Sequence, residues 1–343
     1  MKRFIPMHIL VLCVLFIAAC ENSSFDNPHI ELKDMPITIG SSLSSSRATT
    51  DDVQNDGFGV WAFITNSQQD NYPYMDNTLV KKNNINGELV YSPTKYWLND
   101  TQFSFVATYP YGANGDAFTV NTSSGAVELT LNVSNTPSMY DYLVAREDIN
   151  TSDSNFDPTD AVQLQFQHLL SNVSLKVWRD GVKHQNDQMR VRKVTLSNIR
   201  KAGKYNSSTD TWATTNERLT LTDENNNVTD SDNIGAAIKD DDKLTFGGEG
   251  YTPFSGMMLL PQTIDASNYR VSLKIEYELK RQNAADWEEA ELETVLPAIT
   301  WEIGQQYVYN VVLSSVTAIT VYYIKTKVDP WGTPQVGGTV IIK

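Results

Sequence analysis

Side chains that commonly perform catalysis are few in this sequence, and their spacing fits no catalytic constellation. Beyond residue 19 the histidines are His29, His168 and His184, and none of them lies in an HExxH helix or at metal-ligand spacing. Ser255 lacks the upstream glycine of a nucleophile elbow. We therefore expect a protein that is not an enzyme, with no catalytic residue, no metal and no cofactor.

A calcium site is the other chemistry that the acidic stretches suggest. Asp223, Asn225 and Asn227 begin with the spacing of an EF-hand loop. Position six of such a loop requires glycine but is Val228 here, and position twelve requires glutamate but is Ile234. The sequence therefore excludes an EF-hand, and we interpret this stretch as a solvated loop.

Cys20 is the residue with the most specific chemistry, which is lipidation. Two basic residues at the N-terminus precede an apolar segment, residues 9–17, and the small pair Ala18-Ala19, as in a secretory signal too short to span a bilayer. Residues 17–20 (IAAC) resemble the bacterial lipobox, whose cysteine becomes the acylated first residue of a lipoprotein. Acylation would anchor the chain in the outer membrane. The alternative is an ordinary signal peptide with a chance cysteine.

Removal of the signal, residues 1–19, changes both the cysteine content and the charge. Cys13 leaves with it, so the mature chain keeps Cys20 alone and has no intramolecular disulfide. An exported chain without disulfides must be held together by burial. The formal charge is −14 for the whole sequence and −16 without Lys2 and Arg3. Such a charge disfavours nucleic acid and anionic lipid as partners.

The residues after Cys20 begin with a polar tether and one short apolar strand. Residues 35–39 (MPITI) have the composition of a strand. A serine-rich run, residues 41–46, follows Gly40 and is typical of an exposed, flexible linker. We therefore interpret residues 20–47 as a tether with a separable first strand.

The rest of the chain has the periodicities of β-strands. Residues 58–64 (FGVWAFI) are apolar at both parities, as in a strand at the centre of a sheet. Residues 126–133 and 269–279 alternate between apolar and polar side chains. Helix-period segments of useful length are absent, although residues 234–238 could form one short turn. These patterns predict an all-β chain with two β-sandwiches in tandem.

The clearest alternation in the sequence marks the predicted domain boundary. Val162, Leu164 and Phe166 alternate with glutamines, and the pattern resumes at Val173 on the opposite parity. A one-residue phase change exchanges the buried and exposed faces, so it requires a bulge, a bend or passage into another sandwich. We place the boundary near Pro158, which divides the chain into residues 48–158 and 159–343.

Several passages along the chain form a recognisable series. They are YSPTKYW (91–97) with FSFVATYP (103–110), YDYLVA (140–145), VQLQFQHLLS (162–171), VTLSNI (194–199), MLLPQ (258–262) and WxxGxxYxY (301–309). In this order they resemble the fimbrillin family, the fimbrium subunits of anaerobic Gram-negative commensals. The resemblance implies two tandem transthyretin-like β-sandwich domains. It also implies export as a lipoprotein and cleavage by an extracellular arginine- or lysine-specific protease. Cleavage removes the first strand, and a strand from a neighbouring subunit's C-terminal region fills the groove, which is β-augmentation.

The resemblance assigns roles to residues at both ends of the chain. It places cleavage between Arg47 and Ala48, with Lys33 as a competing site and an ordinary linker arginine as the alternative. The removable strand carries Ile37 and Ile39. Donation is assigned to residues 331–343, where the apolar residues are Val336, Val340 and Ile342. The alternative for this tail is a fixed last strand of the second sandwich.

Together these observations predict a structural subunit of a cell-surface fimbrium that supports adhesion. Its expected partners are other fimbrial subunits, an arginine-specific protease, the outer membrane through Cys20, and a surface glycan or protein of a host or bacterium, but no nucleic acid. Stalk, tip and anchor positions in the fibre all stay open. The alternative function is a monomeric outer-membrane lipoprotein that binds glycans through the loop tyrosines Tyr72, Tyr74, Tyr109 and Tyr111.

Overall fold

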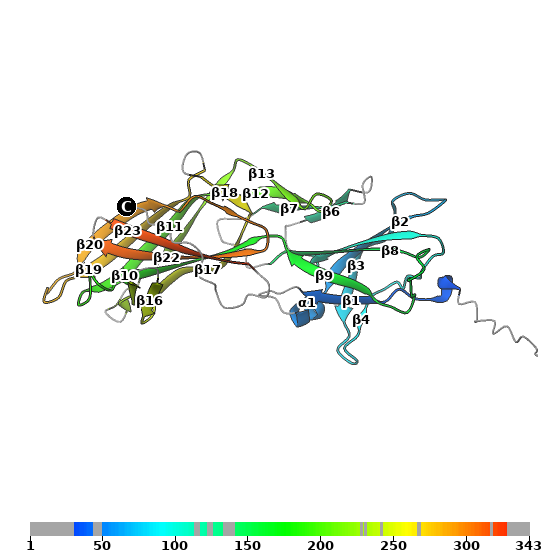
Figure 1. Ribbon diagram of the computed structural model, residues 1–343, viewed down its shortest axis with the longest axis horizontal. Coiled ribbons are helices and arrows are strands. Elements are labelled where there is room, and N and C mark those ends of the chain that lie inside the picture. The colour runs from blue at the N-terminus through cyan, green and yellow to red at the C-terminus, as the bar shows by residue number, and fades with distance from the viewer. Residues whose placement is uncertain are drawn as a thin grey trace, which may run out of the picture. The chain divides into compact units, whose positions relative to one another are not determined.

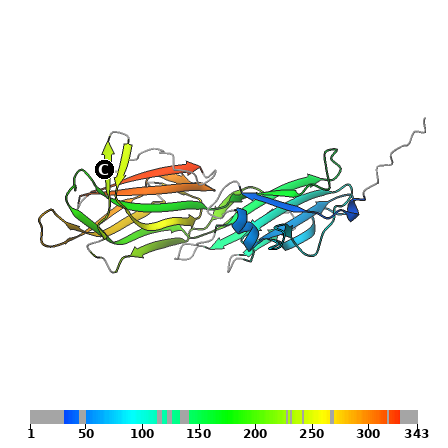
Figure 2. The same cartoon turned by 90° about the horizontal axis from the view of Figure 1, so that it is seen from below.

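The structure is a computed structural model in which most described residues lie in β-strands (Figure 1 and Figure 2). It describes residues 31–43, 50–112, 117–121, 126–132, 141–226, 229, 232–240, 243–265, 269–315 and 318–327. Contacts group the chain from Leu32 onward into one compact unit. The helical elements of the described part are the short turn η1 (Leu32–Asp34) and the helix α1 (Thr50–Asp56). The prediction of a mostly β chain is therefore confirmed.

The first half of the chain forms a seven-stranded sheet. Its strand order is β1-β9-β8-β5-β2-β3-β4. Strand β2, which is apolar on both of its faces, lies in the interior of this sheet between β5 and β3, as the sequence predicts. The strands are β1 (Ile39–Leu43), β2 (Phe58–Thr65), β3 (Tyr72–Lys82), β4 (Leu89–Val90), β5 (Gln102–Tyr109), β8 (Leu143–Asn150) and β9 (Val162–His168).

The two faces of this sheet contribute to different hydrophobic cores. One face packs with α1 around Trp97, whose indole meets the ring of Phe103 edge-on at a centroid distance of 5.1 Å. The Trp97 indole nitrogen donates to the carbonyl of Pro158 at 3.1 Å. The other face, which includes Trp61, packs into a second core shared with Tyr205. Both faces of β2 are therefore buried, which explains its unbroken apolar sequence.

A small sheet connects segments from both sides of the predicted domain boundary. Its order is β13-β12-β7-β6, and Leu129 of β7 lies opposite Tyr205 of β12 in an antiparallel pair. β7 precedes Pro158 and β12 follows it, so periodicity alone could not reveal this pairing. The boundary itself stays a prediction. The strands are β6 (Ala117–Asn121), β7 (Ala126–Asn132), β12 (Ala202–Asn206) and β13 (Thr211–Thr214).

The later part of the chain forms two larger sheets and one short pair. The larger sheets have the orders β16-β15-β10-β22-β23, with β17 also on β10, and β14-β11-β19-β20, and β18 pairs with β21. The strands are β10 (Ser171–Asp180), β11 (Gln188–Arg200), β14 (Arg218–Glu224), β15 (Ala236–Asp240), β16 (Lys243–Gly247), β17 (Tyr251–Leu259), β18 (Gln262–Ile264), β19 (Ser272–Lys280), β20 (Glu288–Val295), β21 (Ile299–Trp301), β22 (Gln305–Ser315) and β23 (Ala318–Lys327).

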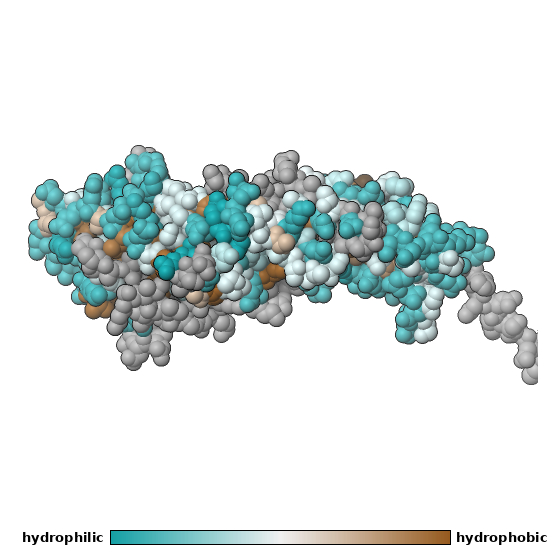
Figure 3. Space-filling model, turned by 90° about the horizontal axis from the view of Figure 1, so that it is seen from above, coloured by the Kyte–Doolittle hydropathy of each residue, from teal (hydrophilic) through white to brown (hydrophobic). Residues whose placement is uncertain are grey.

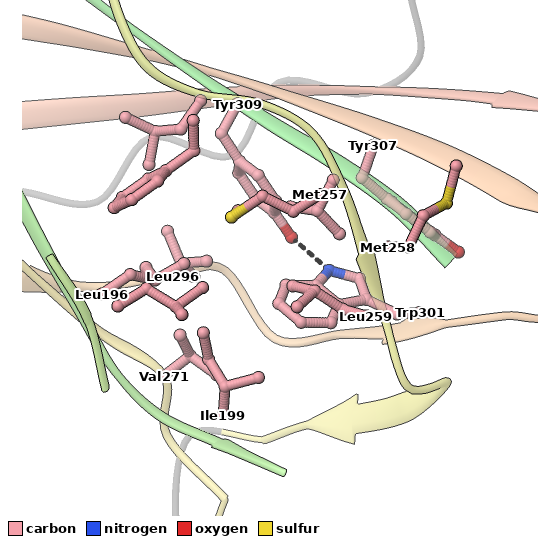
Figure 4. Close-up of a cluster of buried hydrophobic side chains, with 14 of the residues drawn as sticks. Leu196, Ile199, Met257, Met258, Leu259, Val271, Leu296, Trp301, Tyr307 and Tyr309 are labelled. Carbon is pink, nitrogen blue, oxygen red and sulfur yellow. Dashed lines mark hydrogen bonds between the residues drawn. The ribbon is translucent and has the colours of Figure 1, made fainter. Parts of the chain in front are cut away.

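The core of this later part contains large aromatic side chains with satisfied polar atoms (Figure 4). Trp301 is fully buried and donates its indole N–H to the hydroxyl of Tyr309 at 2.9 Å. The Tyr307 hydroxyl donates to the carbonyl of Thr300 at 2.8 Å. Met257, Met258, Leu259, Val271 and Leu296 fill the space around them. Burial of this kind stabilises a fold without disulfides.

The phase change after His168 is a passage between sheets. β9 belongs to the seven-stranded sheet, whereas β10, three residues later, belongs to the sheet of β22 and β17. The phase change therefore coincides with the passage of the chain from one sheet to another, and β10 also has register shifts against β17 between Val173 and Val177. His168 itself is buried, and its Nδ1 lies 2.9 Å from Oδ1 of Asp141, so its contacts are structural.

Two local predictions are wrong. The short turn predicted at residues 234–238 overlaps strand β15, because residues 236–240 pair antiparallel with β16 and begin a parallel ladder on β10. The helix α1 (TDDVQND) is absent from the sequence prediction, because it has no apolar period and Val53 is the one buried side chain among residues 52–56. Contact of Val53 with the core around Trp97 holds this helix in place.

Candidate assembly site at the first strand

β1 is an edge strand of the seven-stranded sheet and is joined to it by a single ladder. It pairs in parallel with β9, and Ile39 lies opposite Val162 while Leu43 lies opposite Phe166 (Figure 1). β9 pairs with β8 on its other side only at Leu143 and Val144. The contact that holds β1 is therefore five residue pairs long and lies at the sheet's margin.

The residues just before β1 are held by backbone bonds to the loop of residues 91–97. The Ile37 amide donates to the Lys95 carbonyl at 2.8 Å, and the Trp97 amide donates to the Met35 carbonyl at 3.1 Å. The Tyr91 hydroxyl donates to the Ile37 carbonyl at 2.7 Å. The segment thus lies between this loop on one side and β9 on the other, where the Val162 amide donates to the Thr38 carbonyl.

The inner face of the segment completes the core around Trp97. Ile37 and Ile39 are 2% and 6% exposed, and they share that core with Val53 and Phe166. Each fully buried isoleucine contributes about 1.5–3 kcal/mol. Ile37 and Ile39 are therefore buried contacts of this segment, and their role as the removable strand stays a prediction.

The outer face of β1 is polar, and the strand begins later than predicted. Pro36 has no N–H to donate and makes only an isolated bridge opposite Tyr96, so the regular ladder starts at Ile39 and not at residue 35. Ser41 and Ser42 belong to the strand and not to a linker. The side chain of Gln54 in α1 donates to the Ser41 hydroxyl at 3.1 Å. α1 therefore contacts the strand through a polar bond.

The other predicted assembly residues lie outside the described part of the chain. This holds for Cys20, Arg47 and Ala48, and for Val336, Val340 and Ile342 in the tail. α1 begins at Thr50, so β1 and the sheet are connected through residues 44–49, which contain Arg47. At the other end, β23 pairs with β22 and ends at Lys327, just before the predicted donor segment.

The four tyrosines of the glycan alternative do not form one platform. Tyr109 is 9% exposed and its hydroxyl donates to Asp56, while the Tyr74 hydroxyl donates to the Tyr96 carbonyl. Tyr72 lies opposite Ile64 at the end of β2, whereas Tyr111 bonds to Gly57 just before β2 begins. The two exposed tyrosines therefore lie at opposite ends of one strand.

Within the described ranges, no three His, Cys, Asp or Glu side chains gather as metal ligands would. In the same part of the chain, no helix combines the length and apolar composition needed to cross a membrane. The face displayed in Figure 3 carries mainly hydrophilic side chains, with apolar ones scattered among them.

Comparison with known proteins agrees with the resemblance read from the motifs. A family model described as fimbrillin-like matches residues 46–331. The chain belongs to the fimbrillin-like family. For this fimbrillin-like chain, the match begins just before Arg47 and ends where the predicted donor segment begins. No curated protein matches the sequence.

A solved structure shares the fold of the fimbrillin-like chain. A fimbrial protein from Bacteroides vulgatus ATCC 8482 matches with a TM-score of 0.62 and 18% identity, over 84% of this chain and 99% of that one. A candidate cell adhesion protein from Bacteroides uniformis ATCC 8492 matches with a TM-score of 0.48 and 17% identity, over 86% and 99% of the two chains. One from Bacteroides ovatus ATCC 8483 has a TM-score of 0.47 and 19% identity, over 84% and 95%.

Sequence reasoning missed the residues that hold the segment before β1. Tyr91 and Lys95 both lie in the YSPTKYW passage that carried the resemblance, but nothing in the sequence indicates that they pair with the first strand. Their contact with Ile37 depends on the fold, because 54 residues separate Tyr91 from Ile37. Gln54 lies in a helix with no apolar period and gave no signal.

Proposed function

We propose that this chain is a structural subunit of a cell-surface fimbrium that polymerises by donor-strand exchange. In this proposal it is exported as a lipoprotein acylated at Cys20, and an arginine-specific protease cuts between Arg47 and Ala48. The observation that carries the proposal is the position of β1 and the residues just before it. Ile37 and Ile39 are buried in a core, β1 is an edge strand, and the segment containing Arg47 joins it to the rest of the chain.

Loss of the segment before Ala48 would leave both a backbone edge and an apolar slot. β9 would lose its parallel partner at residues 162–166, so a row of backbone donors and acceptors would become available. The side chains around Ile37 and Ile39, among them Trp97 and Phe166, would lose about 3–6 kcal/mol of burial. An extended strand with apolar side chains at alternate positions would restore both kinds of contact.

The C-terminal residues have the pattern that such a slot requires. Val340 and Ile342 are two positions apart, like Ile37 and Ile39, and Val336 has the same parity. Donation from one subunit to the next would link identical or related chains head to tail. Cleavage at Arg47 would also separate the assembled domains from the lipid on Cys20, so a subunit that anchors the fibre would be one that stays uncut.

Removal of the tail tests the donor half of the proposal. A chain lacking residues 331–343 should still be exported and cut, because its slot and cleavage site are unchanged, but it should accumulate as monomers that begin at Ala48. The measurement is a gel under mild denaturing conditions, on which strand-exchanged polymers run as a ladder.

The matched control replaces Gln335, which has the opposite parity to Val336, with alanine and should leave the ladder intact. A normal ladder from the truncated chain would contradict donation by this tail and favour the fixed last strand. A rival monomeric lipoprotein predicts no ladder from any form and an intact lipid on Cys20.

A further inference from the structure

A polar groove of about 530 Å³ lies on the outer face of the seven-stranded sheet. Its lining includes Ser42, Arg146, Gln163, Gln165, Gln167 and Asp210. These residues come from β1, β8, β9 and the turn between β12 and β13. The groove therefore lies on the face of β9 that points away from the Trp97 core, and it is separate from the slot of Ile37 and Ile39.

The floor of the groove consists of amide groups that are free to bind a ligand. Gln163, Gln165 and Gln167 alternate with the buried side chains of β9 and are all exposed. Among the described residues, none is hydrogen-bonded to these three side-chain amides. Each amide offers both a donor and an acceptor, and successive amides on one strand face lie about 6.6 Å apart along it. The floor is thus a row of paired donors and acceptors.

One wall of the groove is fixed by an ionic network. Nη2 of Arg146 lies 3.3 Å from the Tyr205 hydroxyl and 3.5 Å from Oδ1 of Asp210. The Tyr205 hydroxyl donates to Asp210. Burial and this contact raise the pKa of Tyr205, so its hydroxyl stays a donor at neutral pH. The carboxylate of Asp210 offsets the charge of Arg146, which leaves the wall polar without a net positive charge.

The chemistry of the groove excludes several classes of ligand. An anionic ligand lacks an unpaired cation here, and the whole chain carries a formal charge of −14. β1 occupies one edge of β9 along residues 162–166, so an extended peptide cannot add as a strand on that edge. An apolar ligand would leave the amides unpaired. A neutral ligand rich in hydroxyl groups meets none of these objections.

We propose that this groove binds a neutral oligosaccharide. The three glutamine amides pair with hydroxyl groups along the sugar chain, and Arg146 and Asp210 bind at its end. The volume falls within the range of about 300–1,000 Å³ that is usual for small-ligand sites. The inference goes beyond the structural role, because it gives the subunit a recognition surface of its own.

The test uses full-length chain in which Arg47 is replaced by alanine, so that Ser42 and the rest of β1 stay in place whether or not the polymerisation mechanism is right. The probe is an array of neutral and acidic oligosaccharides, followed by titration of the best neutral binder. The triple change Gln163→Ala, Gln165→Ala and Gln167→Ala should weaken that binding at least about tenfold, since each amide loses its hydrogen bonds.

Two controls separate the groove from other surfaces. Gln188→Ala removes an exposed glutamine from β11, and Tyr72→Ala removes an exposed ring, and both should leave the affinity unchanged. Unchanged melting temperature in the triple variant excludes unfolding as the cause of its loss. The proposal is overturned by any of three results: no binding to a neutral oligosaccharide, undiminished binding by the triple variant, or tighter binding of the acidic members.

Discussion

Replacing Arg47 with alanine should stop assembly and leave full-length, lipidated monomers at the cell surface. The reason is that β1 would stay covalently joined to α1 through residues 44–49 and would keep the slot of Ile37 and Ile39 filled. An intramolecular strand is present at a high effective concentration, so a strand from another subunit cannot displace it readily. The polymer ladder on a mildly denaturing gel should fall to background.

The matched control is Lys33→Ala, which removes the competing basic site in η1. It should be cut and should polymerise like the unmodified chain. If the Arg47 variant forms normal fibres, the proposed mechanism is wrong. If the Lys33 variant alone loses them, cleavage occurs before β1 and not after it.

Shortening both isoleucines of the first strand should destabilise the uncut chain strongly. Ile37→Ala together with Ile39→Ala leaves two gaps in the core around Trp97, at a cost of about 2–5 kcal/mol for each site. We expect a total loss of about 4–10 kcal/mol in the free energy of unfolding, measured by denaturant titration of chains that also carry Arg47→Ala. A slot opened in this way should also admit a foreign strand before cleavage.

The control for this pair is Ser42→Ala, an exposed position of β1, which should change the free energy of unfolding by less than about 0.5 kcal/mol. After cleavage, fibres of the double variant and of the unmodified chain should have the same stability, because neither changed residue remains. A persistent difference between the two fibres would show that the first strand stays in the polymer.

The sequence anticipated those elements whose burial is regular. β9 alternates between apolar and polar residues because it buries one face. β2 is apolar over residues 58–64 because it buries both faces. The start of β1 was misplaced because its ladder depends on β9, more than a hundred residues away, and not on the apolar run itself. The helix α1 was missed because one buried valine gives no period.

The sequence predicts a site when its residues are neighbours in the chain, and it does not predict one that the fold assembles from distant segments. Ile37 and Ile39 could be selected because they are the apolar alternate residues of a short segment. The polar groove could not, since Asp210 reaches Arg146 from a turn of another sheet. Three exposed glutamines in one strand look like an ordinary solvated face until the fold shows the wall beside them.

N-terminal sequencing of the subunits in purified fibres tests the central claim most directly. The account predicts that stalk subunits begin at Ala48 and that their mass contains no lipid, because cleavage after Arg47 removes Cys20 and the whole of β1 together. Subunits that are blocked at an acylated Cys20 throughout the fibre would contradict it.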